Sequence, residues 1–164
     1  MNGAMLLPEF DQEMANTRKA LERLPDDRLS YKPHPKSFSL HDLAAHVANI
    51  PSWTRITLTT TELDLNHFWD RKVPADRAAI LADFDAGVAD GRAVLAKATH
   101  ADMNVNWTLR SGDQVWFTQP RAAVFRMFVM SHLIHHRAQL TVYLRLLDVP
   151  VPGMYGPSAD EQPS

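Results

Sequence analysis

Two histidines, His132 and His136, lie four residues apart in residues 120–147, the longest segment of uninterrupted helical periodicity in the chain. Side chains four residues apart on a helix project the same way, with Cβ atoms about 5–6 Å apart, so one metal ion can contact both imidazoles. Both histidines fall on the stripe that should face the core, where the other positions are mainly apolar. The spacing therefore predicts a pair of metal ligands.

The alternative is that these histidines are ordinary core residues. A single histidine on an apolar stripe is more often a hydrogen-bonded core side chain than a ligand. Two imidazoles stacked one turn apart would each cost about 1–3 kcal/mol if left without a partner, and a shared metal ion would offset both costs. His135 lies about 100° around the helix from His136, so we expect it to flank the site or to be exposed.

A third histidine, His46, lies on the core-facing stripe of a second predicted helix, residues 39–60, whose start Ser37 or Ser39 can cap. Pro51 should kink this helix, because proline lacks a backbone donor and clashes with the preceding turn. A kink beside His46 would open space near the bundle axis, as a pocket requires. We therefore expect His46 to converge with the histidines of residues 120–147 at one level of the core.

Three neutral imidazoles and a water are typical of an open, catalytic-type metal site rather than a closed structural one. Such a ligand set suits zinc, nickel, iron or copper; zinc or nickel is the expected ion, with iron as an alternative. Leu133 stands where the His-Glu-x-x-His motif of zinc proteases has its general-base glutamate, which disfavours peptide hydrolysis. The sequence identifies no catalytic residue.

Four further residues lie close to the predicted ligands in sequence. Gln139 and Tyr143 follow His136 on the same helical face, and core packing is the favoured interpretation of Tyr143. Asp42, one turn before His46, either orients that imidazole or stabilises the start of its helix. Arg137 should point away from the stripe and form a salt bridge or a dimer contact.

The elements that must position these residues form an all-α fold, which we expect to be a single four-helix-bundle domain over residues 1–164. A long crossover connects the second and third helices, and a short β-hairpin precedes the last helix, where alternating apolar residues flank Ser111-Gly112-Asp113. Thr118 should cap the last helix, and the apolar residues after Leu147 could pack back onto the bundle. The predicted ranges are 4–24, 39–60, 76–98 and 120–147 for the helices, 62–74 for the crossover and 105–118 for the hairpin.

Composition limits the classes of function. The 164-residue chain carries a formal net charge of −2, which points neither to nucleic acid nor to an anionic membrane surface. It contains no cysteine, so any metal must be held by histidine, carboxylate or water. The first residues lack the basic region of a signal peptide, and no apolar run approaches the ~18 residues that span a bilayer. We expect a cytoplasmic protein.

Three stretches of the sequence resemble the DinB-like superfamily of metal-dependent bundle proteins, a family distinct from the DNA polymerase of the same name. The resemblance covers most of the chain, and its most specific part is the His-x-x-x-His-Arg-x-Gln run from His132 to Gln139. The matching stretches are LHDLAAHVANIPSW, SHLIHHRAQLTVYLRLL and VPVPGMYGPSADE.

The resemblance implies a divalent-metal site and a small-molecule substrate. A histidine of the second helix and two of the fourth bind the metal in that family, which corresponds to His46, His132 and His136. Some members are transferases or isomerases that use a small thiol, and dimers are common among them. We therefore expect a metal-dependent transferase with a thiol cosubstrate that forms a homodimer. A hydrolase that uses metal-bound hydroxide and a non-enzymatic metal- or ligand-binding protein of the stress response are the alternatives.

Overall fold

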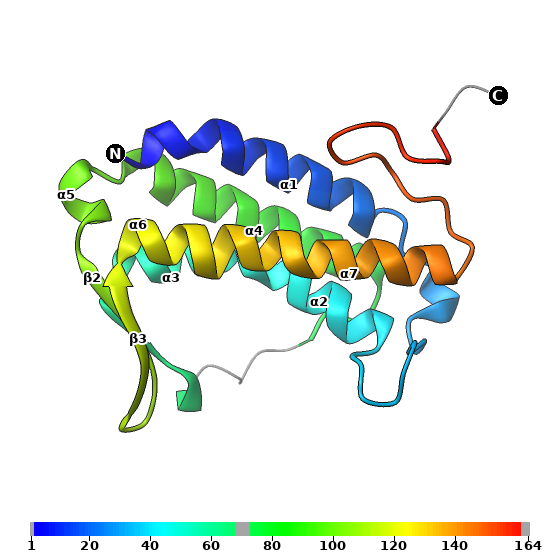
Figure 1. The fold of residues 1–164 in the computed structure, drawn as a ribbon, viewed down its shortest axis with the longest axis horizontal. Coiled ribbons are helices and arrows are strands. Elements are labelled where there is room, and N and C mark those ends of the chain that lie inside the picture. The colour runs from blue at the N-terminus through cyan, green and yellow to red at the C-terminus, as the bar shows by residue number, and fades with distance from the viewer. Residues whose placement is uncertain (1, 68–72, 162–164) are drawn as a thin grey trace.

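The computed structural model describes residues 2–67 and 73–161. The chain is mostly helical, as expected, and it also contains a small three-stranded sheet in the described residues. Helices α1, α4 and α7 run along the long axis of the molecule, and the sheet lies at one end (Figure 1). The helices are α1 (Leu7–Leu21), α2 (Leu40–Asn49), α3 (Trp53–Thr59), α4 (Arg77–Lys97), α5 (His100–Met103), α6 (Arg121–Val124) and α7 (His132–Leu146).

The predicted second helix is interrupted at Pro51. A 3₁₀ turn, Ile50–Ser52, separates α2 from α3, because Pro51 cannot supply the backbone hydrogen bond that would continue α2. The interruption packs closely against α4. A Cβ on Gly91 would lie 2.8 Å from the carbonyl oxygen of Pro51, and one on Gly87 would lie 3.2 Å from the backbone nitrogen of Ser52. These two glycines therefore allow the chain at the kink to approach α4.

The hairpin is confirmed, and the sheet has a strand that the sequence did not predict. Strands β2 (Asn106–Ser111) and β3 (Gln114–Pro120) are antiparallel, and Gly112 in their turn has φ +57°, a conformation that favours glycine. Strand β1 (Glu62–Asp64) pairs with β2 in parallel. Its three residues are too few for an alternating pattern, so the first part of the predicted crossover was wrongly assigned to a loop. Residues 68–72 of that connection lie outside the described residues.

The last helix does not begin as predicted. Thr118 belongs to β3 and does not cap the helix; α6 starts after Pro120 without a side-chain cap. Residues Phe125–Ser131 form a π-helical segment between α6 and α7. A π-helix has more residues per turn than an α-helix, so this segment rotates the residues that follow it around the helix axis.

The rotation moves the buried stripe of α7 by one position. Phe125 and Val129 are buried as predicted, but the stripe continues through Leu133, Arg137, Leu140 and Leu144 rather than through the histidines. His132 and His136 therefore lie half-buried, on the side of α7 that faces α2. The prediction that Arg137 points away from the core was wrong, because its side chain is buried against α1.

The C-terminal segment packs back onto the helices, as predicted. It turns back from the end of α7 towards α1 (Figure 1). The buried amide of Asn16 donates a hydrogen bond of 2.9 Å to the carbonyl oxygen of Met154. The hydroxyl of Tyr155 donates to the carboxylate of Glu13 and accepts from Arg137. Arg137 thus joins α7, α1 and the C-terminal segment, and its predicted salt bridge is formed with Glu13 at 2.7 Å.

Candidate metal centre

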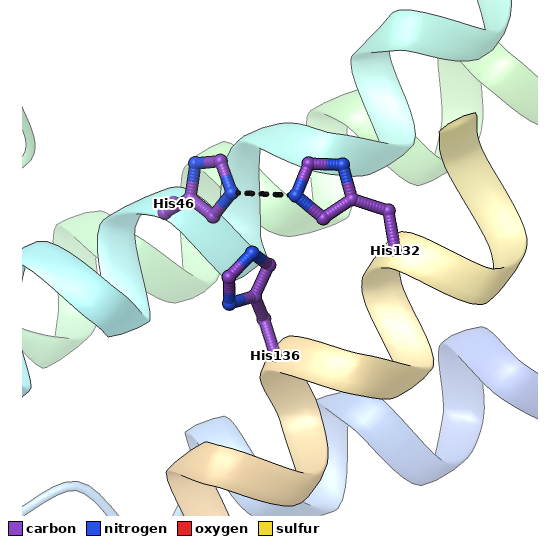
Figure 2. Close-up of side chains that lie close together, drawn as sticks. All are labelled: His46, His132 and His136. Carbon is purple, nitrogen blue, oxygen red and sulfur yellow. Dashed lines mark hydrogen bonds between the residues drawn. The ribbon is translucent and has the colours of Figure 1, made fainter. Parts of the chain in front are cut away.

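Three imidazole rings meet between α2 and α7 (Figure 2). His46 comes from α2, His132 begins α7, and His136 lies one turn later; one ring nitrogen from each lies within 4.8 Å of the other two. The Nε2 atoms of His46 and His132 are 3.2 Å apart. The ring centroid of His136 lies 4.6 Å from each of the other two ring centroids. The structure thus brings together the three histidines that the sequence singled out.

Local structure explains why these rings meet. Ser39 caps α2, since its hydroxyl oxygen accepts a hydrogen bond of 3.0 Å from the backbone N–H of Asp42. His46 therefore lies on the second turn of a helix with a fixed start. On α7, the four-residue spacing of His132 and His136 places both rings on the same side, and the π-helical segment turns that side towards α2.

Aromatic side chains surround the histidines on several sides. The Trp53 ring centroid lies 5.6 Å from that of His46 and 5.2 Å from that of His132, and Trp53 stacks on Phe128. Phe38, which is 53% exposed, has its centroid 6.2 Å from that of His46. Phe128 was not predicted to belong to the site, although its position one turn before His132 on the same helix was a usable signal.

These surroundings keep the imidazoles neutral. Burial lowers the pKa of His46 to about 4, with a further contribution from repulsion by the other two rings. Burial likewise lowers the pKa of His132 to about 4, and repulsion by His136 adds to the effect. The pKa of His136 is also lowered, again mainly by burial. Metal ligation requires neutral imidazole, so near neutral pH these side chains are in the protonation state that a metal needs.

One of the histidines has a side-chain acceptor of its own on α7. The Nδ1 atom of His136 lies 2.7 Å from the Oε1 atom of Gln139. For His132, a hydrogen bond with the backbone of Phe128 raises the pKa and so acts against the effect of burial. The Asp42 carboxylate lies in the first turn of α2, where it bonds to the Ser39 hydroxyl at 2.7 Å. The interpretation of Asp42 as a helix-start residue is therefore the correct one.

Other residues near the site in sequence lie outside the group of three. His135 is exposed, as expected, with its ring centroid 4.9 Å from that of His136. The hydroxyl of Tyr143 donates to the carbonyl oxygen of Phe38 at 3.3 Å, so Tyr143 has a packing role. A cavity of about 430 Å³ lies beside the kink at Pro51, but it opens between the kink and α4, and no histidine lines it.

The donor set fits a divalent metal ion. Ligand nitrogens about 2.0–2.1 Å from a tetrahedral zinc ion lie about 3.3 Å from one another, and the 3.2 Å separation of the His46 and His132 Nε2 atoms is close to this value. In the structure these two atoms share a hydrogen bond (Figure 2), so one of them carries a proton, which must leave before both nitrogens can bind one ion. Within the described residues, these three histidines are the group of histidine, aspartate or glutamate side chains that lie close enough together to share a metal ion.

A comparison with protein-family models places the chain among known proteins. The model of the DinB family matches residues 1–163. The chain belongs to the DinB family. This confirms the resemblance seen in the sequence.

The chain is also similar to individual proteins over most of its length. The uncharacterized protein YrdA of Bacillus subtilis is 25% identical over 159 residues, which cover 94% of this chain and 89% of YrdA. A DinB-like protein of Bacillus cereus superposes with a TM-score of 0.70 at 23% identity, over 92% of this chain and 95% of its own. The DinB-like protein YjoA of Bacillus subtilis gives a TM-score of 0.70 at 17% identity, over 96% and 98%. At these identities the two solved structures establish the fold alone.

No helix in the described part of this DinB-family chain has both the length and the apolar character needed to cross a bilayer.

Proposed function

We propose that this DinB-family protein binds one divalent metal ion through His46, His132 and His136 and uses it to act on a small molecule. The observation that carries the proposal is the convergence of three imidazole nitrogens within 4.8 Å of one another, without a carboxylate among them. Zinc or nickel is the expected ion, with iron as the alternative.

A divalent ion held by three neutral imidazoles keeps an open coordination position and lowers the pKa of a water or thiol that binds there. Among the described residues, no carboxylate oxygen lies together with the three imidazole nitrogens, so the ligand set is uncharged. An anionic ligand is therefore favoured over a cationic one. The three histidines are half-buried rather than sealed in the core, so a small molecule can approach them.

Among reactions of this kind, we propose transfer to or from a small thiol cosubstrate. The neutral ligand set supports this choice, since a thiolate compensates the charge of the ion. The family resemblance supports it as well. Trp53, Phe128 and the exposed ring of Phe38 provide apolar surface next to the histidines, where the organic part of a thiol or of its partner substrate can pack. We assign no catalytic residue.

The four-helix bundle, the single domain, the homodimer and the cytoplasmic location remain predictions from the sequence.

Metal titration of single variants tests the binding site. His46→Ala, His132→Ala and His136→Ala should each lose tight zinc binding, because two imidazoles and water hold the ion poorly. His135→Ala is the matched control: it removes an exposed ring from the same helix and should leave affinity close to wild type. Equal losses in all four variants, or retention in His136→Ala with loss in His135→Ala, would contradict the assignment.

Cobalt-substituted protein separates the candidate reactions. Addition of N-acetylcysteine should produce a sulfur-to-cobalt charge-transfer band, and the zinc protein should then accelerate conjugation of that thiol to an electrophilic test compound. Ester hydrolysis without thiol would favour the hydrolase. Metal binding without either reaction would favour the non-enzymatic alternative.

A further inference from the structure

The hydrogen bond between His136 and Gln139 determines which ring nitrogen of His136 can bind a metal. The amide oxygen of Gln139 lies 2.7 Å from Nδ1 of His136, so a neutral His136 must carry its proton on Nδ1 to donate to it. Its Nε2 atom then keeps a free lone pair. Gln139 follows His136 by three residues on α7, a spacing at which two side chains on a helix meet.

The backbone beside His132 departs from a regular α-helix. Its Nε2 atom faces His46, so Nδ1 is the nitrogen available to the backbone of Phe128. In a regular α-helix the Phe128 carbonyl would accept the backbone N–H of His132. Here that N–H is directed to the carbonyl of Val129, at the end of the π-helical segment. The irregular turn therefore leaves the Phe128 carbonyl available to the imidazole.

We infer that Gln139 is a positioning residue of the metal centre: it holds His136 as the Nδ1–H tautomer and so presents Nε2 to the ion. This inference rests on the proposed metal binding and deepens it. Without Gln139, His136 can place its proton on Nε2, which then cannot bind a metal until the proton moves. Loss of a hydrogen-bond acceptor that holds the other nitrogen of a metal-binding imidazole typically weakens metal affinity by about 10- to 100-fold. Because Gln139 is exposed, where water competes for the hydrogen bond, we expect the lower end of that range.

The first measurement is made on metal-free protein. Imidazole nitrogen chemical shifts at about pH 8, above the ordinary histidine pKa, report which nitrogen carries the proton. In wild type, His136 should be the Nδ1–H tautomer. Gln139→Leu, which keeps the bulk but removes the acceptor, should shift His136 towards Nε2–H and leave His132 unchanged, because the Gln139 oxygen contacts His136. Gln139→Glu keeps an acceptor oxygen and should keep the proton on Nδ1.

The second measurement is zinc affinity by competition with a chelator. Gln139→Leu should weaken zinc binding about tenfold, and Gln139→Glu should restore it to the wild-type value or better. The matched control is Gln12→Leu, the same change at an exposed glutamine of α1 whose side chain bonds to Asn16 on its own helix; it should alter neither measurement. An unchanged His136 tautomer in Gln139→Leu, or an unchanged zinc affinity, overturns the inference. Absence of zinc binding by wild type would refute the proposed function, and the metal-free spectra would still decide whether Gln139 sets the tautomer.

Discussion

The buried ion pair between Arg137 and Glu13 should respond strongly to the loss of one partner. The two side chains are 3% and 8% exposed, and Nη1 of Arg137 lies 2.7 Å from Oε2 of Glu13. Replacement of Glu13 by leucine would leave a buried guanidinium without its counter-charge. The typical cost of such a change is about 3–5 kcal/mol in the free energy of unfolding. For a domain of this size, this corresponds to a decrease of roughly 6–20 °C in the melting temperature.

Further contacts of Arg137 make the pair part of a network. Its Nη1 donates to the carbonyl oxygen of Glu13 and to Oγ1 of Thr17, and its Nη2 donates to the hydroxyl of Tyr155 at 2.6 Å. Arg137→Met should therefore also destabilise the protein, because the Glu13 carboxylate would then keep only the Tyr155 hydroxyl among these partners. The double variant Glu13→Leu/Arg137→Met removes both charges and should be less destabilised than either single variant.

Urea unfolding in the presence of a chelator, followed by circular dichroism, measures all three variants without a contribution from bound metal. Asp11→Asn is the control, because it breaks an ion pair with Arg92 in which both side chains are more than 40% exposed. Its unfolding midpoint should stay close to wild type, since solvent screens such a pair. A loss below about 1 kcal/mol in both single variants, or a double variant whose loss equals the sum of the single losses, would refute the reasoning.

Two further predictions follow from the structure. Because the pKa of His46 and of His132 is lowered to about 4 in the folded protein, the unfolded chain binds protons first as the pH falls below the ordinary value of about 6.5. The contribution of these two histidines to the free energy of unfolding of the metal-free protein should thus be constant above about pH 6.5. It should decrease as the pH falls towards 4, by about 1–2 kcal/mol per histidine after allowance for partial exposure. Urea midpoints across this pH range should fall less in a His46→Asn/His132→Asn variant, and an equal dependence of the midpoint on pH in the two proteins would contradict the assignment. Gly91→Ala should lower the melting temperature despite the better helix propensity of alanine, because its Cβ would lie 2.8 Å from the Pro51 carbonyl oxygen and overpacking costs about 1–3 kcal/mol. Gly156→Ala is the control, because no atom lies within 4 Å of the added Cβ. A stabilised Gly91→Ala variant would disprove the close approach.

The sequence by itself determined the features that depend on local periodicity and on single residues with special backbone properties. Helical spacing placed His132 and His136 on one side of a helix, alternating residues identified the β2–β3 hairpin, and Pro51 marked the interruption of the second helix. The absence of cysteine restricts the possible metal ligands to histidine, carboxylate or water whatever the fold. These signals act over a few residues, where chain geometry alone decides which side chains lie together.

Only the tertiary structure decided the features that join distant segments. Strand β1 is recognisable through its parallel pairing with β2, because three residues carry no pattern of their own. The π-helical segment moved the buried stripe of α7 by one residue, which placed Arg137 rather than His136 in the core. Arg137 could be buried because Glu13 lies opposite it across 124 positions of sequence. A charge enters the core only with a partner, and a partner that far along the chain is chosen by packing between helices, which local periodicity does not encode.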